Sequence, residues 1–167
     1  ILAPHIMMFQ RSAVLTIDRL SLGLPGDLPA KYAAAPNIHI DIGSPALTDM
    51  TYTSAADIYL GDVSSQIYEY LKDPRPAVFL NTHRVAYGSD PNYLHWTAGP
   101  VIESVSELGS ALEHAVADHE HRYKPIQKSL FDYTFDLNDE PSARRSAVAI
   151  SRLLGECAAV EMPREEP

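Results

Sequence analysis

Two adjacent serines follow an aspartate at the end of a short apolar run, in the segment Gly61-Asp62-Val63-Ser64-Ser65. Residues 58–60 are predicted to form a strand and residues 64–71 a helix. The start of a helix offers unpaired N–H groups and a positive dipole end, which bind anions, and serine hydroxyls can add donors. Gly61 permits close approach, and Asp62 can cap the turn or bind a ligand hydroxyl. Because Asp and Ser are also ordinary N-caps, the segment predicts either a simple cap or a phosphate site.

Strand and helix patterns alternate around this segment. Short apolar strands are expected at residues 1–3, 38–42, 58–60, 77–80 and 101–102. Helices are expected at residues 28–34, 48–56, 64–71, 104–121, 125–131 and about 140–154. The order predicts an α/β fold with a Rossmann-like parallel sheet flanked by helices. Ligands bind such sheets at the carboxyl ends of the strands, where the turn at residues 61–65 must lie.

Composition limits the class of partner. The chain has 167 residues, of which 46% are apolar, and a formal net charge of −9. One domain is expected over residues 1–160, followed by a frayed tail over residues 161–167. The acidic balance argues against nucleic acid or an anionic membrane surface as the main partner. The single cysteine, Cys157, cannot form an intrachain disulfide and is typical of a reducing compartment.

A long irregular stretch, residues 81–99, separates two of the predicted strands. Loops of this length inside a compact domain are usually functional or mobile. The stretch contains His83, Arg84, His95 and Trp96, which can contact a ligand or simply pack the loop.

A metal site is not predicted. His114, His119 and His121 lie on one expected helix, but their spacings of five and two residues do not converge on one ion. The chain has no P-loop, G-x-G-x-x-G, Cys-x-x-Cys or G-x-S-x-G motif. This argues against kinases, dinucleotide-dependent dehydrogenases, zinc modules and α/β-hydrolases.

Four segments resemble one family in the same order. They are "LAPHIMMF" with His5, "ADIYLGDVSSQIYEYL", "TAGPVIESVSELGSAL" and "FDLNDEPSARRSAVAI" with Arg144. Together they resemble the CDP-glycerol glycerophosphotransferase family, teichoic-acid-polymerase-like enzymes with a GT-B fold. Val63 stands where the family has a tyrosine, and Glu140 where it has a glycine.

The resemblance implies a role for each matched residue. The chain would be the carboxy-terminal, donor-binding half of a GT-B transferase, with an amino-terminal acceptor domain absent from it. Gly61, Asp62, Ser64, Ser65 and Arg144 would hold the donor phosphates. His5 would be the catalytic residue, donating to a phosphate or stabilising the leaving group. His83, Arg84 and His95 would be further loop contacts. No cofactor is implied, since the nucleotide-activated donor is the substrate.

The resemblance also implies a reaction and a location. A glycerophosphate or glycosyl group would pass from a nucleotide diphosphate donor to a hydroxyl of a cell-envelope polymer or glycan. CDP-glycerol and nucleotide sugars stay open as donors. The location implied is cytoplasmic, with membrane contact at the inner face only through the missing part. The alternatives are a sugar-nucleotide 2-epimerase-like half domain and a non-catalytic nucleotide-binding or regulatory module. A receiver domain with Asp62 as phospho-acceptor has less support.

Overall fold

The structure is a computed structural model that describes residues 1–4, 14–16, 21–23 and 28–154. Contacts divide the chain into two compact units, Ile1–Phe131 and Asp132–Pro167, and each is described by itself. The single domain predicted over residues 1–160 stays a prediction. The tail predicted over residues 161–167 lies outside the described residues.

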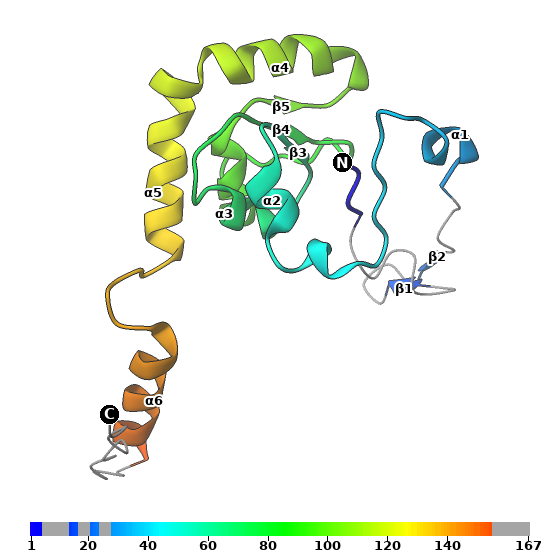
Figure 1. Cartoon of the computed structure of the whole chain (residues 1–167). Coiled ribbons are helices and arrows are strands. Elements are labelled where there is room, and N and C mark those ends of the chain that lie inside the picture. Colours follow the sequence, from blue (N-terminus) through cyan, green and yellow to red (C-terminus); the bar gives the residue numbers. More distant parts are fainter. Residues whose placement is uncertain (5–13, 17–20, 24–27, 155–167) are drawn as a thin grey trace. The chain divides into compact units, whose positions relative to one another are not determined.

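Short strands and helices alternate through most of the described chain (Figure 1). The strands are β1 (Val14–Thr16), β2 (Ser21–Gly23), β3 (Tyr59–Gly61), β4 (Ala77–Leu80) and β5 (Val101–Ile102). The α-helices are α1 (Ala30–Ala33), α2 (Thr51–Ala55), α3 (Gln66–Tyr70), α4 (Leu108–Ala117), α5 (Lys124–Thr134) and α6 (Ser142–Leu153). The 3-10 helices are η1 (Pro45–Leu47), η2 (Pro91–Ala98) and η3 (Val105–Glu107), and η4 (His119–Tyr123) is a π-helix.

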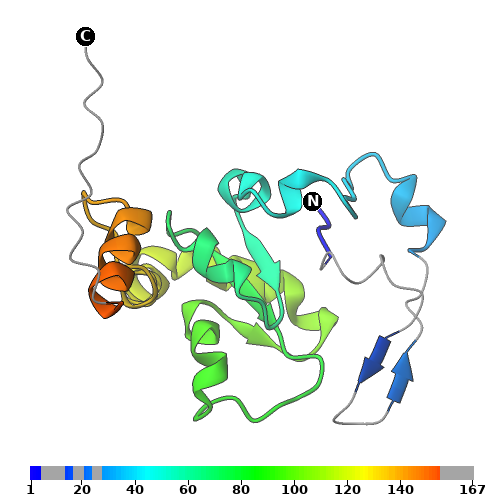
Figure 2. The ribbon, with the colours of Figure 1, turned by 90° about the horizontal axis from the view of Figure 1, so that it is seen from below.

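A parallel sheet in the order β3-β4-β5 lies at the centre of the first unit (Figure 1). Gly61 pairs with Phe79, and Phe79 pairs with Val101. The central strand β4 is a continuous apolar run, as expected of a parallel strand that is buried on both faces. The predicted α/β class with a parallel sheet is confirmed, with a sheet of three strands. Figure 2 shows β1 and β2 as a separate antiparallel pair.

Alternate side chains of β4 enter two different cores. Phe79 packs in a cluster with Ile67 and Tyr70 of α3 and with Trp96 of η2. Val78 packs in a second cluster with Ile102, Ala111 and Ala115, the last two from α4. Helices therefore cover both faces of the sheet, as the alternation of strands and helices predicted.

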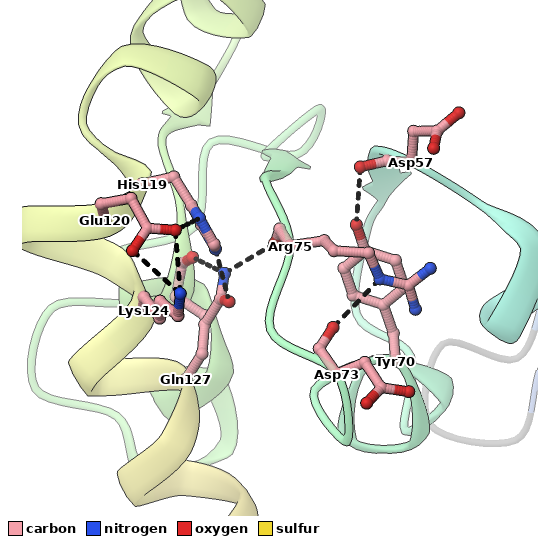
Figure 3. Close-up of polar contacts among 9 residues, drawn as sticks. Asp57, Tyr70, Asp73, Arg75, His119, Glu120, Lys124 and Gln127 are labelled. Carbon is pink, nitrogen blue, oxygen red and sulfur yellow. Dashed lines mark hydrogen bonds and ion pairs between the residues drawn. The ribbon is translucent and has the colours of Figure 1, made fainter.

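A buried glutamine joins the amino ends of β4 and β5 by hydrogen bonds. Gln127 of α5 is fully buried. Its side-chain NH₂ donates to the carbonyls of Arg75 (3.0 Å) and Ala98 (2.9 Å), just before β4 and β5. Its Oε1 accepts from His119 Nε2 at 3.2 Å, because both amide hydrogens are used by the carbonyls (Figure 3). Every hydrogen-bonding atom of the Gln127 side chain therefore has a partner.

Arg75 connects the segment before β4 to the end of α2 by hydrogen bonds. Its guanidinium donates to the carbonyls of Thr53, Ser54 and Ala56 at the end of that helix. It also lies over the Tyr70 ring, 4.5 Å from the ring centre, and Figure 3 shows the two side chains together. A planar, permanently charged fork suits several carbonyl acceptors at once.

Several elements of the structure differ in their bounds or type from those predicted from the sequence. The strands expected at residues 1–3 and 38–42 meet only at a parallel bridge between Leu2 and Ile40. The helix expected over residues 104–121 is divided into η3, α4 and η4. Ser104 Oγ accepts from the Ser106 amide rather than from the amide three residues on, because the first turn is a 3-10 turn. Within the described ranges, no helix combines the length and apolarity needed to cross a bilayer.

Candidate functional site

The turn after β3 carries the two serines that motivated the phosphate-site prediction. Ser64 Oγ accepts from the Gln66 amide at 3.3 Å, one residue before the N-cap of α3. The N-cap residue, Ser65, makes no side-chain capping hydrogen bond, so the choice between a simple cap and a phosphate site stays a prediction. Ser65 and Asp62 are exposed. A Cβ at Gly61 would lie 2.5 Å from the Tyr59 hydroxyl oxygen, which explains the glycine. Burial raises the pKa of Tyr59 to about 12, so its hydroxyl is a neutral neighbour of the turn.

The turn after β4 is held rigidly by a residue that the sequence did not single out. Asn81 is 1% exposed, and its side chain both donates to the Val85 carbonyl (3.1 Å) and accepts from the Val85 amide (2.9 Å). Arg84 closes the turn with a φ of 51°, in the left-handed region that is unfavourable for a side chain of its size. His83 and Arg84 are both exposed. The buried anchor therefore presents two basic side chains to solvent.

The strand register brings three turns to one edge. Because Gly61, Phe79 and Val101 are level across the sheet, the residues just beyond the three strand ends emerge side by side. Neighbouring strands lie about 4.8 Å apart. The Arg84 guanidinium lies 3.7 Å from the Glu103 carboxylate, which confirms that the turns after β4 and β5 meet. This edge therefore combines the Asp62–Ser65 turn with His83, Arg84 and Glu103.

His95 and Trp96 lie beneath this edge rather than on it. Trp96 is 2% exposed and donates from Nε1 to the Asp62 carbonyl at 3.3 Å. His95 is 4% exposed, and its ring lies 5.8 Å from that of Phe79 and 6.1 Å from that of Tyr68. Burial lowers the pKa of His95, and a hydrogen bond with the Asp62 backbone opposes this shift. Both side chains lie on the core side of the Asp62–Ser65 turn.

Two residues predicted for the site are not placed at this edge by the structure. His5 lies outside the described residues. Among the described residues, Ala3 lines a small hollow together with Gln66, the residue after Ser65. Arg144 lies on α6, in the second unit, and pairs with the Glu140 carboxylate at 3.2 Å. The roles of His5 and Arg144 stay predictions.

A second polar cluster surrounds Asp41, which the sequence reading treated only as part of a strand. Its carboxylate accepts from the Ser44 hydroxyl, from the Tyr52 hydroxyl (2.6 Å) and from the amides of Gly43 and Ser44. The Ser44 and Tyr52 hydroxyls, followed by the two amides, hold the pKa of Asp41 well below its usual value. Tyr52 also contacts His39 Nε2 at 3.1 Å. Since the carboxylate is saturated with donors, the cluster is best suited to holding the loop that begins η1.

The edge carries hydrogen-bond donors and two carboxylates. Exposed hydroxyls, backbone amides, His83 and Arg84 can donate to phosphate oxygens, while Asp62 and Glu103 add negative charge beside them. Within the described ranges, no three His, Cys, Asp or Glu side chains group as metal ligands would. The sequence missed Asn81, although a lone amide directly after a buried strand could have signalled an anchored turn. Comparison of the chain with protein-family models, with curated proteins and with solved structures found no match.

Proposed function

We propose that this chain is the nucleotide-donor-binding part of a GT-B-type transferase that uses a nucleotide-activated donor. One observation carries the proposal. The turns after two neighbouring parallel strands, Asp62–Ser65 and His83–Arg84, emerge at the same carboxyl edge. Ligands of open α/β sheets bind at this edge. The resemblance of the four sequence segments to the CDP-glycerol glycerophosphotransferase family supports the same reading.

Each side chain has a simple task in this proposal. When the bond to the transferred group breaks, negative charge grows on the leaving nucleotide diphosphate, and donors aimed at it lower the barrier. Ser65 and the amides of the turn hold one phosphate, while the Arg84 guanidinium can form two parallel hydrogen bonds to phosphate oxygens. His5 and Arg144 keep the roles that the resemblance implies, His5 as proton donor or electrostatic partner and Arg144 as a phosphate ligand, and the structure places neither at this edge. The acceptor hydroxyl belongs to the polymer or glycan substrate, and a separate acceptor domain would bind it and supply the base.

Titration of the 167-residue chain with CDP, UDP and GDP tests the proposal. We expect weak binding by calorimetry, together with NMR shifts of the amides of residues 62–65 and 82–84. Because charge-assisted bonds contribute about 1.5–3 kcal/mol each, Arg84→Ala should weaken binding about tenfold or more. Lys128→Ala, an exposed change on α5, is the control and should leave binding unchanged. If none of the three nucleotides perturbs either turn, the assignment is wrong.

The alternatives give different outcomes in the same series. An epimerase-like half domain would prefer UDP, and the full-length protein would convert a nucleotide sugar without an acceptor. A non-catalytic binding module would bind nucleotide in the full-length protein and transfer nothing. A product assay on the full-length protein therefore separates the three functions.

A further inference from the structure

The indole of Trp96 reaches the candidate phosphate turn from the core. Its N–H donates to the Asp62 carbonyl at 3.3 Å across 34 residues of sequence. Tyr87 and Tyr93 hold the indole edge to face, with ring centres 5.0 and 4.7 Å from it. With 2% exposure, the indole has little freedom to leave this position. The Asp62 carbonyl is therefore directed into the core.

Peptide geometry turns this inward carbonyl into an outward donor. The peptide between Asp62 and Val63 is trans and planar, so its C=O and N–H point in opposite directions. With the Asp62 oxygen directed at the buried indole, the Val63 N–H points away from the core. The Val63 side chain is 52% exposed, so this side of the turn faces solvent. The bond from Trp96 thus sets the direction of an amide that lies next to Ser64.

The neighbouring histidine provides a second, independent observation at the same peptide. His95 is 96% buried (4% exposed), and its Nε2 has no hydrogen-bond partner within the part of the chain that the structure describes. The Asp62 backbone also acts on this ring, because it partly opposes the lowering of the His95 pKa by burial. Unsatisfied buried polar atoms are uncommon in folded proteins, so each one calls for an explanation. Among the described residues, one ring nitrogen of this buried histidine is therefore left unpaired behind the turn.

We infer that Trp96 is a positioning residue for the donor diphosphate: its indole N–H fixes the Asp62 peptide so that the Val63 amide donates to a phosphate oxygen. The inference rests on the proposed function and names a donor that the serine motif alone does not identify. It needs no contact between the indole and the ligand. Val63 suits this role because its backbone, not its side chain, makes the contact.

The test compares Trp96→Phe with Tyr93→Phe. The first keeps an aromatic ring in the cluster but removes the N–H, and the second changes a neighbouring ring without touching Asp62. We expect Trp96→Phe to weaken CDP and inorganic pyrophosphate about tenfold, the loss of one charge-assisted hydrogen bond. Tyr93→Phe should bind as the wild type does. Circular dichroism and thermal unfolding check that each variant is folded.

A second readout separates positioning from a purely structural effect. In the wild-type chain, pyrophosphate should move the Val63 amide proton downfield, as a hydrogen bond to an anion does. In Trp96→Phe this shift should disappear while the Ser65 amide still responds. Unchanged affinity of Trp96→Phe, or a silent Val63 amide beside a responding Ser65 in the wild type, overturns the inference. The wild-type measurement decides even if Trp96→Phe does not fold. If neither CDP nor pyrophosphate perturbs the wild-type turn at all, the proposed function falls as well.

Discussion

The two ends of the three-stranded sheet are built in opposite ways. At the amino ends of β4 and β5, Gln127 is fully buried and bonds to two backbone carbonyls and to His119, and the Arg75 side chain donates to four backbone carbonyls. At the carboxyl ends, Ser65, His83 and Arg84 are exposed to solvent. Polar atoms inside a protein stabilise it only when they are paired, whereas exposed donors contribute little to stability and can bind a ligand.

This contrast suggests that stability and binding are divided between the two ends. Changes at the amino end should unfold the protein without altering which ligands it prefers. Changes at the exposed carboxyl end should alter binding and leave stability nearly unchanged. Buried groups beneath the carboxyl end, such as Asn81 and His95, should affect both.

Gln127→Leu should produce the largest loss of stability. Leucine has a similar volume but leaves the carbonyls of Arg75 and Ala98 and the His119 nitrogen without their partner. We expect the free energy of unfolding to fall by about 3 kcal/mol, as measured by urea denaturation. Lys128→Ala, on the exposed side of the same helix, is the matched control. A loss below about 1 kcal/mol would show that the Gln127 hydrogen bonds contribute little to the stability of the sheet.

Asn81→Ala should lower the free energy of unfolding by less than Gln127→Leu does. It should also weaken binding at the carboxyl edge of the sheet. It removes both hydrogen bonds to the Val85 backbone and frees the turn that presents Arg84. We expect a loss of about 2 kcal/mol in urea denaturation, together with weaker CDP binding. Thr82→Ala, an exposed change in the same turn, should show no loss of stability. Wild-type CDP affinity in a folded Asn81→Ala would argue that this turn takes no part in binding.

His95 predicts a dependence of stability on pH. Its folded-state pKa lies below the usual value of 6.5, because burial disfavours the charged ring. As the pH falls below about 6.5, the unfolded chain takes up the proton first, and stability declines until the folded-state pKa is reached. One such group changes the free energy of unfolding by at most about 1.4 kcal/mol per pH unit.

His95→Phe should therefore lose less stability than the wild type between about pH 7.5 and about pH 5.5. Urea midpoints across this range measure the difference, and His121→Gln, an exposed change, is the control. The same slope in wild type and His95→Phe would mean that His95 is not held neutral by the core.

Arg84→Gly should give the smallest effect, and with the opposite sign. Glycine adopts a φ of 51° without steric cost, and the ion pair that is lost is exposed and long at 3.7 Å. We expect a gain of about 0.5 kcal/mol, after the extra freedom of glycine in the unfolded chain is subtracted. Arg84→Ala keeps the strain and should not be stabilised. Both variants should bind CDP more weakly, and full retention of affinity would contradict the role of the guanidinium.

The sequence predicted those parts of the fold that depend on local patterns. The apolar run at residues 77–80 forms β4 as expected, because a strand buried on both faces needs no alternation. Helix α6 runs from Ser142 to Leu153 after Pro141, close to the expected bounds, because proline at a helix start and glycine past its end are local signals.

Long-range contacts could not be predicted from local patterns. For His95 the sequence left open a ligand contact or simple packing of the loop, and the ring is buried because η2 folds back onto β4 and α3. Gln127 and Asn81 carry no motif, since each is defined by carbonyls or amides that only the fold brings near. The Arg84 turn was predicted only as loop, because its φ of 51° depends on the anchor at Asn81.

The π-helix η4 sets the rotation of the first turns of α5, which follow it directly. A π-turn holds one residue more than an α-turn, and each residue rotates an α-helix by about 100°. Both His119 and Tyr123 are buried in η4, and α5 continues directly from it with Gln127 directed at the sheet. Removing one residue from this turn would rotate α5 by about 100° and carry Gln127 away from the carbonyls that it joins. The length of a single helical turn thus decides whether Gln127 can bond to the carbonyls of Arg75 and Ala98.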